Sequence, residues 1–224
     1  MTRGTVPEAV TFDLFGTLVS VQRLHDPAAA VASELEERGF QIPDDWNEAY
    51  ATPHVDVEPG REISLPEHVR AALEQSGVYL DSGEDGHQQQ ITAAVRSAFD
   101  RPVELRSGAD AAVTAAVEAT GERGTVGVLS NCSIPGLVER TLDRAGLADR
   151  FDAVASSVEI GYRKPHPRPF EAAADRLGVD VVELVHVGDN PDADCGIERL
   201  GGTAICLDET PLSSIPTLLR GEFS

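Results

Sequence analysis

The sequence predicts an α/β fold: a doubly wound parallel sheet with a helical domain inserted after its first strand. From about residue 102 onward, short apolar runs alternate with helical patterns, which is typical of parallel strands covered by helices. One apolar run, beginning at Val10, stands apart near the start, and residues 21–101 show only helical or irregular patterns. A chain of 224 residues is long enough for a core with a smaller insertion. We therefore predict a core formed by residues 1–20 and 102–224, and an inserted helical domain at 21–101.

The first predicted strand begins at Val10 and delivers Asp13 to an open loop. The next element is a helix over Pro27–Arg38, with proline in its first turn and glycine behind it. Ser64-Leu65-Pro66-Glu67 has the form of a capping box and opens a second helix. A further helix is expected over residues 88–99, and residues 50–63, with two prolines, are expected to form a loop.

The predicted core follows the same alternation to its end. Its helices are expected over residues 108–120, 133–145, 168–177 and 194–200, and its strands over 125–129, 153–156, 184–187 and 203–207. Loops that follow parallel strands lie at one edge of the sheet, where ligands bind. The residues after each strand are therefore the expected positions of a binding or catalytic site.

Composition narrows the possible partners and location. The formal charge is -20, from 38 acidic and 18 basic residues, so nucleic-acid phosphates and anionic membranes would repel this surface. The acidic excess, with abundant small apolar residues, is typical of proteins from salt-loving archaea. The absence of an apolar run near 18 residues, or of a leader, predicts a cytoplasmic protein. We expect its partner to be a small-molecule substrate, and neither nucleic acid nor membrane. The sequence carries no signal for an oligomeric state.

The cysteines and the lysine are both scarce. Cys132, Cys195 and Cys206 are odd in number and lack C-x-x-C spacing, which argues against a disulfide framework or zinc site and for a reducing cytoplasm. Of the 18 basic residues, 17 are arginine and only Lys164 is lysine. Lysine is a compact point charge that fits a narrow pocket, whereas arginine is a wide fork, so this exception suggests a specific role.

Polar residues follow four of the predicted strands and together resemble the motifs of the haloacid dehalogenase-like hydrolases. The four segments are Asp13-Leu14-Phe15-Gly16-Thr17, Val128-Leu129-Ser130-Asn131, Gly161-Tyr162-Arg163-Lys164-Pro165, and Gly188-Asp189 followed by Asp194. They occur in the family's order and cover the core. The resemblance implies a Rossmann-type core, in which residues 21–101 form the cap domain that many members insert after the first motif.

The resemblance also implies roles for individual residues. Asp13 would be the nucleophile that forms an aspartyl-phosphate. Thr17 would hold its loop with the hydroxyl and belong to the phosphate-binding residues. Ser130 would bind a phosphate oxygen with Asn131 in support, and Lys164 would neutralise charge between nucleophile and phosphate.

The resemblance also implies a Mg²⁺ ion. Magnesium prefers hard oxygen ligands in octahedral geometry, which this set of residues can supply. Its ligands would be Asp13, the Phe15 carbonyl and Asp189, with Asp194 as a ligand or a support. Asp192 is the alternative to Asp194. A simpler explanation for Asp192 is that its negative charge interacts favourably with the dipole at a helix N-terminus.

Phe15 departs from the pattern of the family's phosphatases. They usually carry a second aspartate at this position, as the general acid and base, and losing such a group typically costs about 10² to 10⁴ in rate. The main alternative is 2-haloacid dehalogenation, whose enzymes carry an aromatic residue here and need neither acid nor metal. Their fourth motif typically reads Ser-Ser-Asn, whereas this chain has Gly188-Asp189-Asn190. The carboxylate of Asp189 beside that of Asp13 places two negative charges together, which a cation or a proton must neutralise. We therefore favour a Mg²⁺-dependent phosphatase, with a phosphoryl-ligand binding or regulatory protein as a third possibility.

The predicted cap also contains polar residues that could reach a substrate, although polar loop residues are usually solvated. These are His25, His54, His68, Asp56, Glu58, Arg61 and Arg70, of which Arg61 and His54 are the first choices for mutation. His186 lies within a predicted strand, where a histidine is more often a satisfied core residue than a catalyst.

Overall fold

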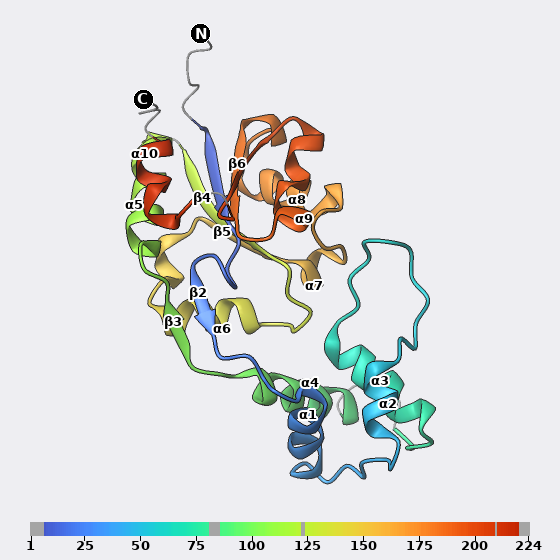
Figure 1. Ribbon diagram of the computed structural model, residues 1–224. Helices are drawn as coiled ribbons and strands as arrows, with labels where there is room; N and C mark the ends of the chain where they lie inside the picture. The colour runs from blue at the N-terminus through green and yellow to red at the C-terminus, as the bar shows by residue number, and fades with distance from the viewer. Residues whose placement is uncertain (1–6, 81–85, 122–123, 209, 220–224) are drawn as a thin grey trace.

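The centre of the molecule is a five-stranded parallel sheet, in a computed structural model that describes residues 7–80, 86–121, 124–208 and 210–219. The strands lie in the order β5-β4-β1-β6-β7 (Figure 1). Their bounds are β1 Ala9–Phe12, β4 Thr125–Ser130, β5 Ala153–Ser156, β6 Leu184–Gly188 and β7 Thr203–Cys206. The chain leaves the sheet's centre after β1 and returns on both sides of it, so the predicted doubly wound α/β class is confirmed.

Helices cover both faces of this sheet, as Figure 1 shows. The helices α5 (Ala109–Thr120), α6 (Leu137–Ala145) and α10 (Ile215–Leu219) pack on one face, and α8 (Pro167–Leu177) with the 3₁₀ helix η4 (Cys195–Leu200) on the other. Side chains alternate between the two faces along each strand, so one strand contributes to the hydrophobic core on either face. Val10 and Phe12 of β1 belong to the core beneath α5, α6 and α10, and Ala9 belongs to the core beneath α8 and η4. Strands buried on both faces explain the near-continuous apolar runs in the sequence.

The strand register determines which side chains meet at the edge of the sheet. Phe12 of β1 lies level with Val128 of β4 and Val187 of β6. The residues that follow these positions, including Asp13, Ser130 and Asp189, therefore leave the sheet at one edge.

A pair of short strands connects the sheet to a separate group of helices. Strand β2 (Val19–Val21) pairs antiparallel with β3 (Val103–Leu105), so the two chain crossings lie side by side. Beyond them, α1 (Pro27–Glu36), α2 (Trp46–Ala51), α3 (Leu65–Gln75) and α4 (His87–Phe99) pack against one another, away from the sheet (Figure 1). We propose that this group is the cap. Residues 1–6, 81–85, 122–123, 209 and 220–224 of the predicted two-domain division lie outside the described residues.

The segment between α2 and α3 returns to the core (Figure 1). Its Glu62 N–H donates to the Gly161 carbonyl at 3.0 Å, and the Arg163 N–H donates to the Gly60 carbonyl at 2.9 Å, on either side of a bridge between Arg61 and Tyr162. Residues 60–62 therefore run antiparallel to the segment that leads into Lys164.

Most predicted elements are confirmed, with local differences. The capping box at Ser64 and Glu67 forms as predicted. The predicted helix at 133–145 starts only at Leu137, because Pro135 and the left-handed Gly136 (φ 74°) precede it. The predicted helix at 194–200 is a 3₁₀ helix, after a single turn α9 (Pro191–Asp194).

Some short elements were not predicted. They include the strands β2 and β3, the helices α7 (Ser157–Ile160) and α10, and the 3₁₀ turns η2 (Ala148–Arg150), η3 (Val181–Glu183) and η5 (Leu212–Ser214). Helix α2 was not predicted either, and it takes Tyr50 and Ala51 out of the expected loop.

The cysteine prediction was partly wrong. Cys195 and Cys206 form a disulfide between η4 and the end of β7, so these two are paired, while Cys132 is a free buried thiol. Spacing in sequence could not indicate this pair, because the fold brings the two residues together from either side of a turn. Within the described residues, no helix has the length and apolar character needed to cross a membrane.

Candidate active site

Lys164, the only lysine of the chain, lies at the centre of the predicted site. Its Nζ donates to Oδ1 of Asp13 at 3.0 Å, to Oδ1 of Asp194 at 2.6 Å and to the Leu129 carbonyl at 2.8 Å. The side chain is only 1% exposed. Three acceptors use all three ammonium protons, so this cation is held in one position between two carboxylates.

Asp13 is buried at the end of β1 and keeps one oxygen free. Its backbone N–H donates to the Val187 carbonyl at 2.8 Å, and its Oδ1 accepts from Lys164. Among the described residues, no donor reaches Oδ2. Burial raises the pKa of Asp13 above its ordinary value; Lys164 opposes this shift, and the negative charge of Asp194 adds to it. A buried carboxylate with a free oxygen beside a cation is the arrangement that a covalent nucleophile requires.

His186 is buried behind Lys164 and Asp194. Its Nε2 lies 3.1 Å from Oδ1 of Asp194, and its Nδ1 lies 2.9 Å from the Thr11 hydroxyl. Since the protons of Lys164 are already used, the consistent assignment has Nε2 donating to Asp194 and Nδ1 accepting from Thr11. Burial lowers the pKa of His186 to about 4, so the ring is neutral near pH 7. His186 is thus a satisfied core residue, and it also orients a carboxylate of the site.

Asp194 has both oxygens engaged by the protein. Oδ1 accepts from Lys164 and His186, and Oδ2 accepts from the backbone N–H of Asn190 at 2.9 Å. Although burial opposes it, the hydrogen bond from His186 and the charge of Lys164 hold the pKa of Asp194 well below its ordinary range. Asp194 was expected to be either a metal ligand or a support for the site. These contacts favour the second role, in which Asp194 supports Lys164 and the loop that contains Asn190. Asp192, the alternative, is exposed.

Asp189 and Thr17 connect the first and fourth motifs. The Thr17 hydroxyl donates to Oδ1 of Asp189 at 2.9 Å, and Thr17 itself is fully buried. Thr17 therefore holds the loop, as predicted for its hydroxyl, and does not face an open site. The Asp189 carboxylate lies directly over Gly16, next to the Phe15–Gly16 peptide.

Gly16 allows this close approach, because its φ is 90° and a Cβ there would collide with the Asp189 carboxylate. We expect Gly16→Ala to lower kcat at least about tenfold and to destabilise the fold by about 1 kcal/mol or more. Gly39→Ala is the matched control, since Gly39 has nearly the same φ of 87° with nothing within 4 Å. Thermal unfolding should show a loss in both variants, and steady-state assays a loss in Gly16→Ala alone. Equal kcat in the two variants would contradict a role for this contact.

Ser130 is the last residue of β4 and Asn131 follows it, and the two side chains make different contacts. The Ser130 hydroxyl is buried and has no hydrogen-bond partner among the described residues. Such a group is rare in folded proteins, because an unpaired buried hydroxyl costs free energy. Asn131 binds the Lys164 backbone twice, donating to its carbonyl at 3.0 Å and accepting from its N–H at 2.8 Å. Asn131 therefore positions the lysine loop, and Ser130 keeps a hydroxyl available for a ligand.

The polar residues of the proposed cap lie in several places. His54 and His68 contact the carbonyls of Ala49 and Tyr50, so both are tied to α2. Arg70 pairs with Glu74 on the same helix, His25 and Asp56 are exposed, and Glu58 accepts a hydrogen bond from the Tyr162 hydroxyl. The Arg61 guanidinium lies 5.0 Å from the centre of the Tyr162 ring. Arg61 is therefore near the lysine loop, whereas His54 is within its own helical group.

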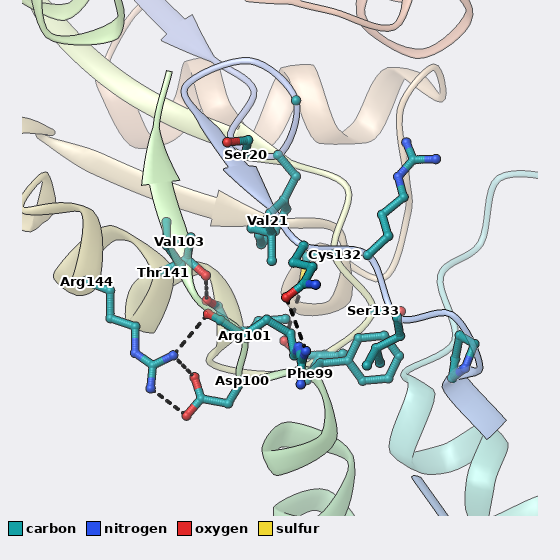
Figure 2. Close-up of a pocket in the computed structure, with 18 of the residues that line it drawn as sticks. Ser20, Val21, Phe99, Asp100, Arg101, Val103, Cys132, Ser133, Thr141 and Arg144 are labelled. Atoms are coloured by element: carbon teal, nitrogen blue, oxygen red, sulfur yellow. Dashed lines mark hydrogen bonds and ion pairs between the residues drawn. The ribbon is translucent and has the colours of Figure 1, made fainter. Parts of the chain in front are cut away.

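A cavity of about 630 Å³ opens beside the nucleophile loop (Figure 2). Phe15, Gly16, Asn131 and Asp189 form its wall on the sheet side. Cys132 also lines it, but burial raises the pKa of this thiol to about 11, so it is a poor nucleophile near neutral pH. The cavity is also lined by Phe99, Asp100, Arg101, Val103 and Arg144. Sequence patterns gave no signal for these residues, because only the folded chain brings them to one cavity.

Comparisons with known proteins agree with this geometry. The family model described as haloacid dehalogenase-like hydrolase matches residues 7–196. A phosphoglycolate phosphatase from Xanthomonas campestris is 30% identical over 189 residues, which cover 82% of this chain and 75% of the relative. A phosphoserine phosphatase from Thermus thermophilus is 41% identical over 80 residues, covering 36% of this chain and 32% of that relative's length.

A solved structure is also similar in fold. A 2-haloacid dehalogenase from Pseudomonas syringae superposes with a TM-score of 0.62 at 23% identity, covering 96% of this chain and 99% of the other. At this identity the similarity concerns the fold alone. The family match spans most of the chain and includes the loops that hold Asp13, Lys164 and Asp189, so the chain belongs to the haloacid dehalogenase-like hydrolases.

Proposed function

We propose that this hydrolase is a Mg²⁺-dependent phosphatase, which acts on a small phosphorylated metabolite through an aspartyl-phosphate at Asp13. The observation that carries the proposal is the charge of the site. Asp13, Asp189 and Asp194 meet there, and Lys164 is the one cation among the described residues that pairs with them. Carboxylates crowded in this way need a further positive charge, which a dehalogenase does not require.

The donor set fits magnesium. Asp13 and Asp189 each keep one oxygen that no described residue engages, and the Phe15 carbonyl lies in the loop that Asp189 covers. No three His, Cys, Asp or Glu side chains among the described residues form a complete metal site. Magnesium sites commonly use one or two carboxylates with water and substrate phosphate. When bound, the ion would neutralise the phosphate and the two carboxylates.

The chain's own residues supply the remaining steps. Oδ2 of Asp13 would attack phosphorus, the bond to the leaving oxygen would break, and water would then hydrolyse the aspartyl-phosphate. Ser130 and Lys164 would hold the phosphate oxygens, Ser130 through its unpaired hydroxyl. Phe15 offers no proton, so the departing oxygen would take its proton from water, which favours substrates with good leaving groups.

Two other functions remain as alternatives with observations of their own. The aromatic Phe15 favours a 2-haloacid dehalogenase with an ester intermediate at Asp13. The missing general acid favours a phosphoryl-ligand binding or regulatory protein with little turnover. The names of the relatives found by sequence support the phosphatase.

One assay separates the three functions. We expect the purified protein to release p-nitrophenol from p-nitrophenyl phosphate with Mg²⁺ and to lose this activity with EDTA. Added Mg²⁺ should restore it, which controls for irreversible damage by the chelator. Chloride release from 2-chloropropionate that EDTA does not change would instead support the dehalogenase. Phosphate binding by calorimetry without turnover of either compound would support the binding protein.

A further inference from the structure

The cavity beside Asp13 is lined by arginines that the acidic residues of the protein do not neutralise. Arg23 and Arg101 both line it, and neither forms an ion pair within the described residues. Arg144 lines the cavity as well, but it is paired with Asp100, so Arg23 and Arg101 are the lining arginines whose charge no described carboxylate neutralises. Resting on the proposed function, we propose that Arg101, assisted by Arg23, binds a carboxylate of the substrate, which is therefore a phosphate ester that carries an acid group.

The guanidinium of Arg101 has few hydrogen-bond acceptors. Among the described residues, its buried Nε has no partner, and the one hydrogen bond of its side chain is a long one of 3.5 Å from Nη2 to Oε1 of Gln22. Guanidinium presents its donors in a planar fork that matches the two oxygens of a carboxylate. Buried donors without acceptors are costly, so an incoming carboxylate would supply what the protein lacks.

The segment that carries Arg101 is fixed in place. Arg144 donates to the Arg101 carbonyl at 3.2 Å and to Oδ2 of Asp100 at 2.8 Å, and Arg140 also pairs with Asp100 at 3.2 Å. In Figure 2, Arg101 lies between the Asp100–Arg144 pair and Cys132 with Ser133. The Pro102 ring further limits the backbone before β3. Asp100 is thus occupied by two other arginines, and the charge of Arg101 remains for a ligand.

The same cavity reaches the nucleophile loop, so Arg101 and that loop face one continuous space. Gly16 and Asp189 line it together with Arg101, and Asp189 already accepts from Thr17. Between the ends, apolar side chains form the wall, among them Val21, Phe99 and Ile134. This arrangement suits a short carbon chain with a phosphate at one end and a carboxylate at the other.

Binding of non-hydrolysable probes tests the subsite without turnover. We expect calorimetry with Mg²⁺ to show phosphonoacetate binding about 10- to 100-fold more tightly than ethylphosphonate, which lacks the carboxylate. Arg101→Gln should remove this preference and leave ethylphosphonate affinity unchanged within about twofold, and Arg101→Lys should retain part of it. Arg199→Gln is the control, because Arg199 is exposed, outside the cavity and without an ion pair in the described structure. Circular dichroism would establish that each variant is folded.

A parallel assay compares hydrolysis of 2-phosphoglycolate and ethyl phosphate. The ratio of their kcat/KM values should fall about 10- to 100-fold from wild type to Arg101→Gln, and comparing variants cancels the difference in leaving groups. Equal binding of phosphonoacetate by wild type and Arg101→Gln would overturn the subsite, even if p-nitrophenyl phosphate is hydrolysed. An Arg101-dependent preference without any turnover would instead support the subsite and count against the phosphatase.

Discussion

Asp13→Asn is expected to lower kcat for p-nitrophenyl phosphate by at least about 10⁴-fold, as loss of a covalent nucleophile typically does. The amide keeps the size of the side chain and can still accept from Lys164, but it cannot attack phosphorus. The variant should also fail to gain a phosphoryl group after an acid quench, whereas mass spectrometry should find that group on the wild-type peptide containing Asp13. Asp143→Asn is the control, because Asp143 is exposed on α6.

Stability gives this experiment a second readout. Burial raises the pKa of Asp13, so its ionised form is disfavoured in the folded protein relative to the unfolded chain. For such a group the folded state loses stability as the pH rises through the ordinary pKa of an aspartate, and a neutral amide avoids that loss. The unfolding midpoint of Asp13→Asn near pH 7 should therefore equal or exceed that of wild type. Retention of more than a tenth of wild-type kcat by a folded variant would refute the nucleophile assignment.

Lys164→Met is expected to lower the free energy of unfolding by about 3–5 kcal/mol and to abolish measurable turnover. The methionine has a similar shape, but it leaves the buried carboxylates of Asp13 and Asp194 without their shared cation. Guanidinium unfolding and the aryl phosphate assay measure the two losses. The exposed pair of Arg150 with Asp110 supplies the control, because Arg150→Met should cost no more than about 1 kcal/mol.

A double variant separates stability from catalysis. Asp194→Asn placed on Lys164→Met removes one unpaired charge and should recover part of the lost stability, while turnover stays absent. If the double variant regains activity together with stability, Lys164 acts only through folding. If Lys164→Met alone is as stable as wild type, the buried pairs carry little energy.

The sequence patterns were sufficient for the parts of the fold with strong periodicity. All five strands of the central sheet were predicted within about two residues, because strands buried on both faces are continuous apolar runs. By contrast, β2 and β3 have three residues each, and they pair across more than 80 positions of the chain. Helix α2, with six residues, is equally short. Tertiary contacts decide such elements, and local patterns do not encode those contacts.

The same distinction applies to the site. Asp13 and Asp189 could be predicted because each follows a buried strand, and Lys164 because it lies in a recognisable Lys-Pro motif. Arg101 could not, because its significance depends on which carboxylates lie near it in space. The hydrogen bond from His186 to Asp194 also depends on the register of β1 against β6, which fixes Thr11 beside the ring.

The single lysine has a practical consequence for spectroscopy. Because Lys164 is the only lysine, incorporation of ¹⁵Nζ-labelled lysine places one isotope-labelled side chain in the whole protein, between Asp13 and Asp194. Its ammonium resonance would report on the active site directly, without a mutation or an attached probe. Ligand titrations followed through that one signal would observe phosphate arriving at the residue proposed to bind it.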